Sequence, residues 1–364
     1  MKVALMVHRF APDFGGVEVT AELIARGLVE RHGAEVTVVT HTREKAGDDS
    51  QFPFSVAREP APAELVRIIR EADVVFHNNP CLQFAWPQAF IRRPWLIALR
   101  TWVTMPGEPL SRLERLKYEA KYAVVERADK LVANSSALAG HVRPQVEVIH
   151  NSYRDDVFFD QGRERPRDSI VFLGRLSSDK GIDLLLEALS LLRERGRRPR
   201  LTLVGEGDFR PAVESRIRSL GLGDQVVLTG RKTGAAINDE LNRHAIAVVP
   251  SRIPEPFGTV ALECAAAGCV TLVAGHGGLP EAIGEAGPVF QPNSAEALAD
   301  GLERLLTDDA YFSSFAEPAR RHVAAHREEV MVDRFHAALL ETVERFETTR
   351  GPRRRGASSR GRRA

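Results

Sequence analysis

The stretch 251–263, which reads SRIPEPFGTVALE, gathers two carboxylates and a glycine at an expected helix start, residue types that could bind a ligand carrying both an anionic group and hydroxyls. Two prolines and a glycine predict that Glu255 stays in a loop and that a helix begins near Gly258. Three backbone amides then remain free at the positive end of that helix, an end that attracts anions: those of Gly258, Thr259 and Val260. Glu263, one turn further on, reaches the same ligand. A carboxylate, free amides and a second carboxylate in this order suit a ligand in which a sugar is joined through a diphosphate to a ribose. The alternative interpretation is that Glu255 and Glu263 are simply solvated side chains beside a turn.

Two cations of the same half of the chain could balance that diphosphate. Arg175 follows the apolar run 169–173, and Lys180 lies five residues further on, at the expected start of a helix. Two fixed cations can neutralise a leaving diphosphate without a metal ion. The alternative is that Arg175 and Lys180 are ordinary surface cations. The sequence has no DxD pair in a suitable loop, so we expect no metal at this site.

The cysteines and histidines show no metal-binding spacing. Cys81, Cys264 and Cys269 form no CxxC pair, and we expect no tight Cys/His cluster. His322 and His326 lie four residues apart, which predicts a solvated helix face rather than a metal site.

The surrounding segments alternate between apolar runs and amphipathic stretches, which predicts an α/β fold with parallel sheets. Expected strands cover residues 3–7, 35–40, 72–76, 95–99, 130–134, 147–149, 169–173, 200–204, 225–228, 245–249 and 270–273. Expected helices cover residues 19–29, 63–71, 110–127, 181–195 and 259–267, and the chain from 294 to about 346 is mostly helical. The polar segment 160–169 predicts a linker between two doubly wound halves. Polar groups after the strands mark the carboxyl ends, where such sheets bind ligands.

Glu255 and Glu263 have the E-x7-E spacing of retaining glycosyltransferases of family 4 (glycosyl transferases group 1), and the chain resembles that family over about residues 1–346. Further landmarks of the family occur in order, namely Gly15-Gly16-Val17-Glu18, Val148-Ile149-His150-Asn151, Gly174-Arg175 with Lys180-Gly181, Gly205-Glu206-Gly207 and Pro250-Ser251. The resemblance implies the GT-B fold, in which two Rossmann-like domains face a central cleft. The expected parts are an acceptor-binding domain (1–160), a nucleotide-sugar-binding domain (161–328), a helix that crosses back to the first domain (329–349) and a disordered basic tail (350–364).

The resemblance also implies roles for single residues. Arg175 and Lys180 would clamp the donor diphosphate, and Glu255 would face the reacting sugar carbon, which makes these three the expected catalytic residues. Glu263 would bind the ribose hydroxyls, and Gly16 would meet the terminal phosphate. The full set of expected donor contacts is Gly16, Gly174, Arg175, Lys180, Arg231, Gly258, Thr259, Val260 and Glu263, with Arg231 and its neighbour Lys232 placed near the base.

One position departs from the family. Its members commonly carry a histidine after the strand found here at 95–99, whereas this loop reads Leu99-Arg100-Thr101-Trp102-Val103-Thr104. Arg100 or Thr101 is expected to replace that histidine, or else His77 reaches in from the neighbouring strand end. Trp102 and Met105 are expected either to shape the acceptor pocket or simply to pack.

Charge and composition narrow the classes of function. The chain has 364 residues with 50 basic and 49 acidic side chains, and residues 350–364 hold seven arginines and no acid. The rest is therefore mildly acidic, unlike a nucleic-acid-binding protein. No apolar run approaches the roughly 18 residues of a membrane span, and no signal peptide is evident, so we expect a cytoplasmic protein. The tail predicts a solubilising end or a peripheral contact with anionic lipid at the inner membrane face.

The expected activity is a retaining, metal-independent transfer of a sugar from a nucleoside diphosphate sugar (UDP or GDP) to an acceptor hydroxyl of a lipid, a saccharide or a natural product. The nucleotide sugar is a substrate, and no cofactor is expected. Two alternatives use the same site: a glycoside phosphorylase or sugar-nucleotide epimerase, and a non-catalytic module that binds sugar nucleotides.

Overall fold

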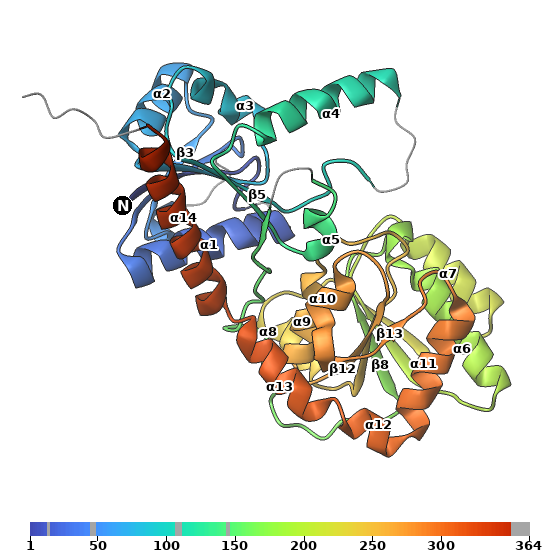
Figure 1. The fold of residues 1–364 in the computed structure, drawn as a ribbon. Helices are drawn as coiled ribbons and strands as arrows, with labels where there is room; N and C mark the ends of the chain where they lie inside the picture. The colour runs from blue at the N-terminus through green and yellow to red at the C-terminus, as the bar shows by residue number, and fades with distance from the viewer. Residues whose placement is uncertain (13–14, 44–48, 106–110, 143–145, 351–364) are drawn as a thin grey trace, which may run out of the picture. The chain divides into compact units, whose positions relative to one another are not determined.

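The computed structural model describes residues 1–12, 15–43, 49–105, 111–142 and 146–350 (Figure 1). The chain divides into two compact units. The first comprises residues 1–98 and 112–131 and the described residues from 334 onward, and the second comprises residues 99–111 and 132–333. The arginine-rich segment 351–364, for which the sequence predicts a disordered tail, lies outside the described residues.

The first sheet has seven strands in the order β3-β2-β1-β4-β5-β6-β7, the pattern of a doubly wound fold. Strand β1 pairs in parallel with β2 on one side and β4 on the other, so that Leu5 lies between Val38 and Phe76. The strands are β1 (Lys2–Met6), β2 (Glu35–Thr40), β3 (Ser55–Arg58), β4 (Val74–Asn78), β5 (Trp95–Leu99), β6 (Lys130–Ala133) and β7 (Glu147–Val148). The division between the units passes through β5 and β6, and β7 is counted with the second unit.

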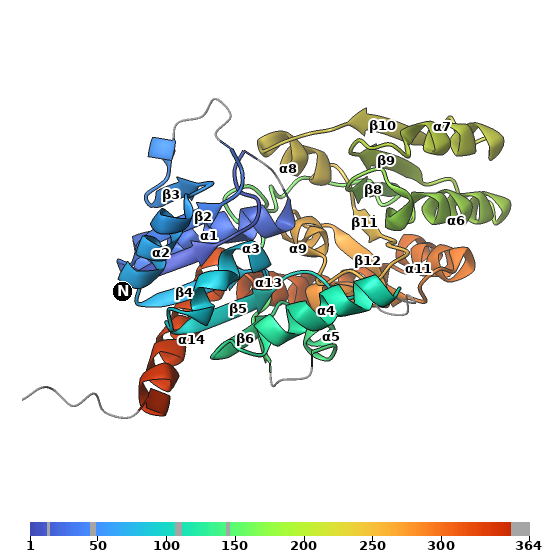
Figure 2. The same ribbon diagram turned by 90° about the horizontal axis from the view of Figure 1, so that it is seen from above.

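Helices cover the faces of this sheet, because its central strands are apolar on both sides. They are α1 (Gly16–His32), α2 (Pro62–Glu71), α3 (Leu82–Ala85) and α4 (Arg112–Val125), with 3-10 turns η1 (Asp49–Gln51) and η2 (Trp86–Ala89). The last helix, α14 (Glu328–Arg350), runs from the second unit into the first. There Phe335 stacks on Phe76 of β4 with ring centroids 5.5 Å apart, and His336 stacks on His32 at the end of α1 at 3.8 Å. Figure 2 shows α14 beside the strands of this sheet.

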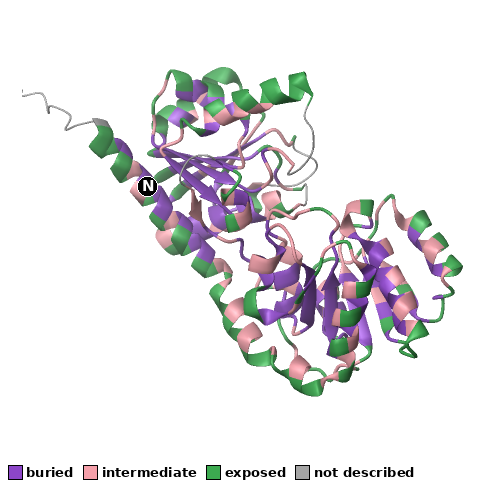
Figure 3. Cartoon of the chain, turned by 45° about the vertical axis from the view of Figure 1, so that its right-hand side comes forward, coloured by how far each residue is buried: buried purple, intermediate pink, exposed green. Residues whose placement is uncertain are grey.

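The second sheet has six strands in the order β10-β9-β8-β11-β12-β13. They are β8 (Ser169–Leu173), β9 (Arg200–Val204), β10 (Val226–Gly230), β11 (Ile246–Val249), β12 (Val270–Ala274) and β13 (Val289–Phe290). The helices of this unit are α5 (Ser136–Ala139), α6 (Ile182–Glu194), α7 (Arg210–Ser219), α8 (Ala235–Leu241), α9 (Thr259–Ala266), α10 (Leu279–Ile283), α11 (Ala295–Thr307), α12 (Asp309–Ser313) and α13 (Ala316–Ala325), with 3-10 turns η3 (Ser178–Lys180) and η4 (Gly284–Ala286). The strands are buried between helices whose outer faces are exposed (Figure 3).

The predicted doubly wound α/β class is confirmed, and four expected strands, at 35–40, 95–99, 169–173 and 200–204, begin and end at the observed residues. Strands β3 and β13 were not predicted, because four and two residues are too short to give a clear apolar pattern. The segment 160–168 contains no helix or strand, but it is held closely to the second unit. Arg165 donates to the side-chain oxygen of Asn242 and to the carbonyl of Ala267, both at 2.8 Å.

Among the described residues, no helix combines the length and the apolar composition needed to cross a membrane.

Candidate functional site

The loop between β11 and α9 has the geometry that its prolines and glycines predict. Helix α9 begins at Thr259, and Gly258 before it has φ +97°, a left-handed conformation that favours glycine. A Cβ atom at Gly258 would also collide with the side chain of Leu279. Within the described chain, three amides at the start of the helix donate to no acceptor, those of Gly258, Thr259 and Val260. The structure therefore presents a free, partly exposed helix N-terminus of the kind that binds phosphate.

Glu255, in the same loop, is held by two side chains. The ammonium of Lys180 lies 2.5 Å from Glu255 Oε1, and the hydroxyl of Ser251 donates to the same oxygen at 2.7 Å. Both charged side chains are mostly buried. The structure thus brings together a cation and a carboxylate that the sequence analysis assigned to different parts of the donor. The positions of Lys180 and Glu255 in the sequence do not predict that the two side chains form an ion pair.

The position of Lys180 is fixed by close packing between two loops. Gly181 has φ +67°, and a Cβ atom there would collide with the carbonyl oxygen of Pro250. The amide of Arg252 donates to the carbonyl of Asp179 at 2.8 Å, and its guanidinium binds both carboxylate oxygens of Asp183, at 3.1 and 2.6 Å. A bidentate pair of this kind defines orientation as well as distance. The loop that carries Lys180 is therefore joined to the loop that carries Glu255.

Arg175 lies on the neighbouring turn after β8. Its guanidinium is exposed and contacts no carboxylate or carbonyl oxygen of the described residues. The backbone beneath it is packed against the next loop, because Cβ atoms at Gly205 and Gly207 would collide with the carbonyl oxygens of Gly174 and Leu176. The Gly205-Glu206-Gly207 motif thus allows two strand ends to approach closely. Arg175 remains available for an anionic ligand.

Glu263, in the second turn of α9, is a partly buried carboxylate that accepts no hydrogen bond from the described residues. Desolvation by burial raises the pKa of Glu263 to about 7, and the attraction of Arg154 opposes this shift. A desolvated carboxylate without a partner is well suited to accept hydrogen bonds from ligand hydroxyls. This environment is compatible with the ribose contact that the family resemblance implies.

The base-side residues are less closely connected to this site. Arg231 follows β10, is exposed, and forms no ion pair within the described residues, whereas Lys232 forms an ion pair with Glu240 at 3.2 Å.

Gly16 lies in the first unit, as the first residue of α1. Space is open at this position, since a Cβ atom there would meet no atom within 4 Å. The side-chain amide of Asn78, at the end of β4, donates to the carbonyl of Val17 at 2.9 Å and so holds the start of the helix against the strand ends. The carboxylate of Glu18 folds back toward Gly15.

His77 does not line a site at the strand ends. It lies within β4 and is fully buried, with its ring against Trp95 at 5.3 Å, and neither ring nitrogen has a partner among the described residues. Desolvation lowers the pKa of His77 to about 3, so it is neutral. The expectation that it could reach the reacting sugar is wrong, because β4 continues to Asn78, two residues beyond the expected end.

The loop after β5 instead contacts the loop that carries Glu255. Trp102 Nε1 donates to the carbonyl of Pro254 at 2.8 Å, and Ser135 Oγ donates to the carbonyl of Pro256 at 2.5 Å. Both neighbours of Glu255 are thus held by hydrogen bonds that sequence spacing could not reveal.

Arg100 is a buried arginine that helps to order the same region. Its guanidinium donates to Asn151 Oδ1 at 2.8 Å, and the amide of Asn151 lies 3.4 Å from the hydroxyl of Thr259, at the start of α9. Desolvation lowers the pKa of Arg100 to about 9, so it still carries its charge at neutral pH. Arg100 thus supports α9 through Asn151.

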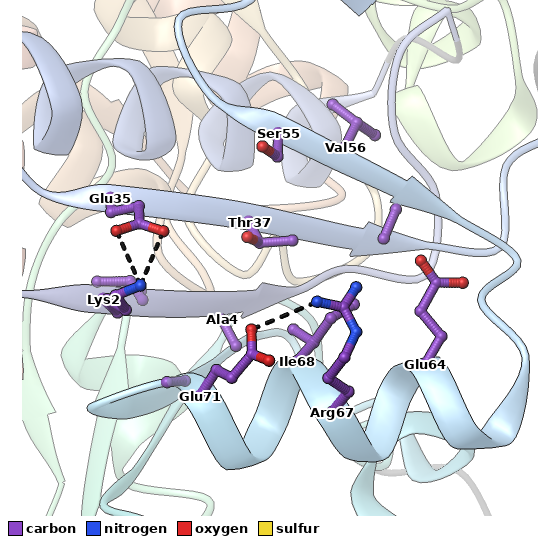
Figure 4. Close-up of a pocket in the computed structure, with 13 residues that line it drawn as sticks. Lys2, Ala4, Glu35, Thr37, Ser55, Val56, Glu64, Arg67, Ile68 and Glu71 are labelled. Atoms are coloured by element: carbon purple, nitrogen blue, oxygen red, sulfur yellow. Dashed lines mark hydrogen bonds and ion pairs between the residues drawn. The ribbon is translucent and has the colours of Figure 1, made fainter.

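A cavity of about 300 Å³ lies in the first unit (Figure 4). Lys2, Glu35 and Ser55, at the beginnings of β1, β2 and β3, line it together with residues of α2. Two ion pairs cross or border it, Lys2 with Glu35 at 3.2 Å and Arg67 with Glu71 at 3.4 Å. Ligands of open α/β sheets bind at the carboxyl ends of strands, so this cavity at the amino ends is not the functional site.

Comparisons with known proteins agree with this geometry. The family described as glycosyl transferases group 1 matches residues 153–322, and glycosyltransferase family 4 matches residues 14–157. An uncharacterized glycosyltransferase of Methanocaldococcus jannaschii is 32% identical, over 89% of this chain and 93% of its own length. Mannosylfructose-phosphate synthase of Agrobacterium fabrum is 35% identical over 40% of this chain and 36% of its own length.

The fold is also found among solved structures. Anabaena HepE, solved in complex with UDP-glucose, superposes with a TM-score of 0.75 at 21% identity, covering 94% of this chain and all of the HepE chain. Taken with the family matches and the full-length relative, this likeness leads to one conclusion. The chain belongs to the family 4 (group 1) glycosyltransferases of the GT-B fold, enzymes that transfer a sugar from a nucleotide sugar.

Proposed function

We propose that this protein is a retaining glycosyltransferase that takes its sugar from a UDP-sugar or a GDP-sugar without a divalent metal and transfers it to a hydroxyl of a lipid, a saccharide or a natural product. The observation that carries the proposal is the Lys180–Glu255 ion pair in the loop that leads into the free N-terminus of α9. A cation for the diphosphate and a carboxylate for the sugar are thereby held within hydrogen-bonding distance. The UDP-glucose bound to HepE supports a nucleotide-sugar donor.

The roles follow from charge and exposure. As the bond between sugar and diphosphate breaks, the leaving group gains negative charge, which Arg175, Lys180 and the amides of α9 stabilise. The carboxylate of Glu255 stabilises the positive charge that develops at the sugar carbon. Glu263 accepts hydrogen bonds from the ribose hydroxyls. The acceptor hydroxyl enters on the face that the diphosphate leaves, and the departing phosphate oxygen removes its proton.

The test begins with a thermal-shift panel of UDP, GDP, ADP and TDP. A nucleotide present at 100 times its dissociation constant stabilises the folded chain by about 2.7 kcal/mol, so one base should stand out. Sugars on the selected nucleotide are then offered with panels of lipid, saccharide and natural-product acceptors, and NMR determines the anomeric configuration of the product. Retention of the donor configuration supports the proposal, whereas inversion contradicts it.

Two control incubations separate the alternatives. Conversion of the donor to an isomer without acceptor would identify an epimerase, and transfer to inorganic phosphate would identify a phosphorylase. Tight nucleotide binding without turnover across both panels would identify a non-catalytic module.

We also propose a cytoplasmic enzyme whose arginine-rich residues 350–364 contact anionic lipid at the inner membrane face. Seven arginines carry the charge for such a contact, each contributing about 1 kcal/mol near an anionic surface.

A further inference from the structure

Two histidines and a cysteine of the first unit, distant in sequence, lie together at the carboxyl ends of three neighbouring strands. His8 follows β1, His41 follows β2 and Cys81 follows β4. The nitrogen or sulfur atoms that each could offer to a metal all lie within 4.8 Å of one another, and Cys81 Sγ is 4.0 Å from His8 Nδ1. The sequence analysis expected no tight Cys/His cluster, and that expectation is wrong because parallel pairing brings the three strand ends together.

The strand ends hold these residues in place. The amide of His41 donates to the carbonyl of His8 at 3.1 Å, and the hydroxyl of Thr40 donates to the same carbonyl at 3.2 Å. The ring of His41 stacks on the ring of the buried Phe84 with centroids 4.1 Å apart, and the ring of His8 lies edge-on to the ring of His41 at 5.4 Å. The hydrogen bonds thus fix the backbone that carries His8 and His41, which is the rigid support that a ligand site needs.

One ring nitrogen of the cluster, Nε2 of His41, is buried and makes no hydrogen bond within the described residues. A buried polar atom without a partner costs free energy, and native structures usually provide a partner for it. His8 is exposed, which leaves a path from solvent to the cluster.

We propose that His8, His41 and Cys81 bind one zinc ion through two imidazole nitrogens and one thiolate. Zinc prefers this mixture of nitrogen and sulfur ligands, with bonds of about 2.0–2.3 Å, and a tetrahedron of that size separates its ligand atoms by about 3.5 Å. The observed separations are somewhat wider, so the side chains would contract around the ion. The thiol proton is released to solvent when the Zn–S bond forms. A fourth position stays open for water.

This site differs from the donor site. None of its three ligands is among the expected donor contacts, of which Gly16 lies in the first unit and Arg175, Lys180 and Glu263 in the second.

The test uses the full chain, stripped of metal with EDTA and dialysed. Titration with Co²⁺, a spectroscopic substitute for Zn²⁺, should give one equivalent of binding and a thiolate-to-cobalt charge-transfer absorption. Zn²⁺ should displace the Co²⁺. In Cys81→Ser the charge-transfer band should vanish and Zn²⁺ affinity should fall by about 100-fold or more, since even residues behind the ligands commonly contribute 10- to 100-fold.

Two controls make the result specific. His8→Ala changes an exposed side chain that the fold does not need, and it should weaken Zn²⁺ binding even if Cys81→Ser were poorly folded. His322→Ala removes one of the two histidines spaced four apart on the other unit and should leave the affinity unchanged. Absence of one-to-one binding, or binding and absorption that persist in both Cys81→Ser and His8→Ala, would overturn the proposal.

Discussion

Lys180 Nζ and Glu255 Oε1 lie 2.5 Å apart, although 75 residues separate them in the chain. The ion pair makes the two charges interdependent. In the proposed mechanism, a donor diphosphate shares Lys180 with Glu255 or takes it from Glu255, and either event changes the field that Glu255 exerts on the sugar. That mechanism therefore links donor binding to activation of the sugar carbon.

Replacing Glu255 with glutamine should reduce turnover by on the order of 100-fold or more while changing nucleotide affinity only modestly. The neutral amide keeps the shape of the side chain but cannot stabilise positive charge at the sugar carbon. The measurement is kcat with a saturating donor, together with calorimetric titration of the nucleotide. Ser251→Ala removes only one hydrogen bond to Glu255 and should have a much smaller effect. Unchanged turnover in Glu255→Gln would remove Glu255 from the mechanism.

The raised pKa of Glu263 predicts a pH-dependent cost to folding. At pH values between 4.5, the usual pKa of a glutamate, and about 7, Glu263 is ionised in the unfolded chain but still protonated in the folded one. As the pH rises through this range, ionisation therefore stabilises the unfolded state and lowers the free energy of unfolding. Below pH 4.5 this cost is absent, and above pH 7 it is constant. The stability of Glu263→Gln relative to the natural chain should therefore rise by up to about 3 kcal/mol between pH 4.5 and pH 8.

Denaturant unfolding at both pH values measures this difference. Any pH-independent effect of the glutamine cancels in the comparison. Glu317→Gln, at an exposed position of α13, should show no such rise. An equal rise in both variants would show that Glu263 is not desolvated.

Replacing Trp102 with phenylalanine should lower kcat by about 3- to 10-fold, because the loop that carries Glu255 loses its hydrogen bond at Pro254 while the aromatic ring is kept. Steady-state kinetics and thermal unfolding should be measured together. Trp86→Phe, at a largely exposed position, is the matched control and should leave kcat unchanged. If both variants had the same kcat as the natural chain, the hydrogen bond would not position Glu255.

Truncation after Thr349 should leave activity on a soluble acceptor intact and abolish binding to vesicles that contain anionic lipid. The deleted residues carry seven arginines, and the remaining body is mildly acidic. Co-sedimentation with anionic and with neutral vesicles measures the binding. Loss of activity on the soluble acceptor would mean that the tail belongs to the catalytic site.

The sequence predicted the fold class well because the strands are continuous apolar runs and prolines and glycines interrupt them at the loops. Glu255, Gly258 and Glu263 could be placed for the same reason, since each depends on local geometry. Contacts between distant segments had no comparable signal. The ion pair of Lys180, the hydrogen bond of Trp102 to Pro254 and the burial of Glu263 all depend on which loops meet in space.

The expectation of no tight Cys/His cluster failed in the same way. Short spacings such as CxxC reveal sites built within one loop. The cluster of His8, His41 and Cys81 is built instead by strand order, with β1 between β2 and β4.

The central claim is that Arg175 and Lys180 hold the charge of the leaving diphosphate without a divalent metal. A charged hydrogen bond contributes roughly 1.5–3 kcal/mol, so loss of either side chain should slow transfer by about 10- to 150-fold. The double variant Arg175→Ala, Lys180→Ala should be slower still, whereas Arg218→Ala, an exposed cation on α7, should match the natural chain.

The most direct measurement is the transfer rate of the natural chain in EDTA, before and after addition of Mg²⁺, Mn²⁺ or Zn²⁺, with Cys81→Ser assayed in parallel. The account predicts that activity survives EDTA in both proteins and that neither Mg²⁺ nor Mn²⁺ restores the double variant. Recovery by Zn²⁺ alone, in the natural chain but not in Cys81→Ser, would concern only the proposed zinc site. Complete loss of activity in EDTA, reversed by Mg²⁺ or Mn²⁺ in both proteins, would contradict the claim.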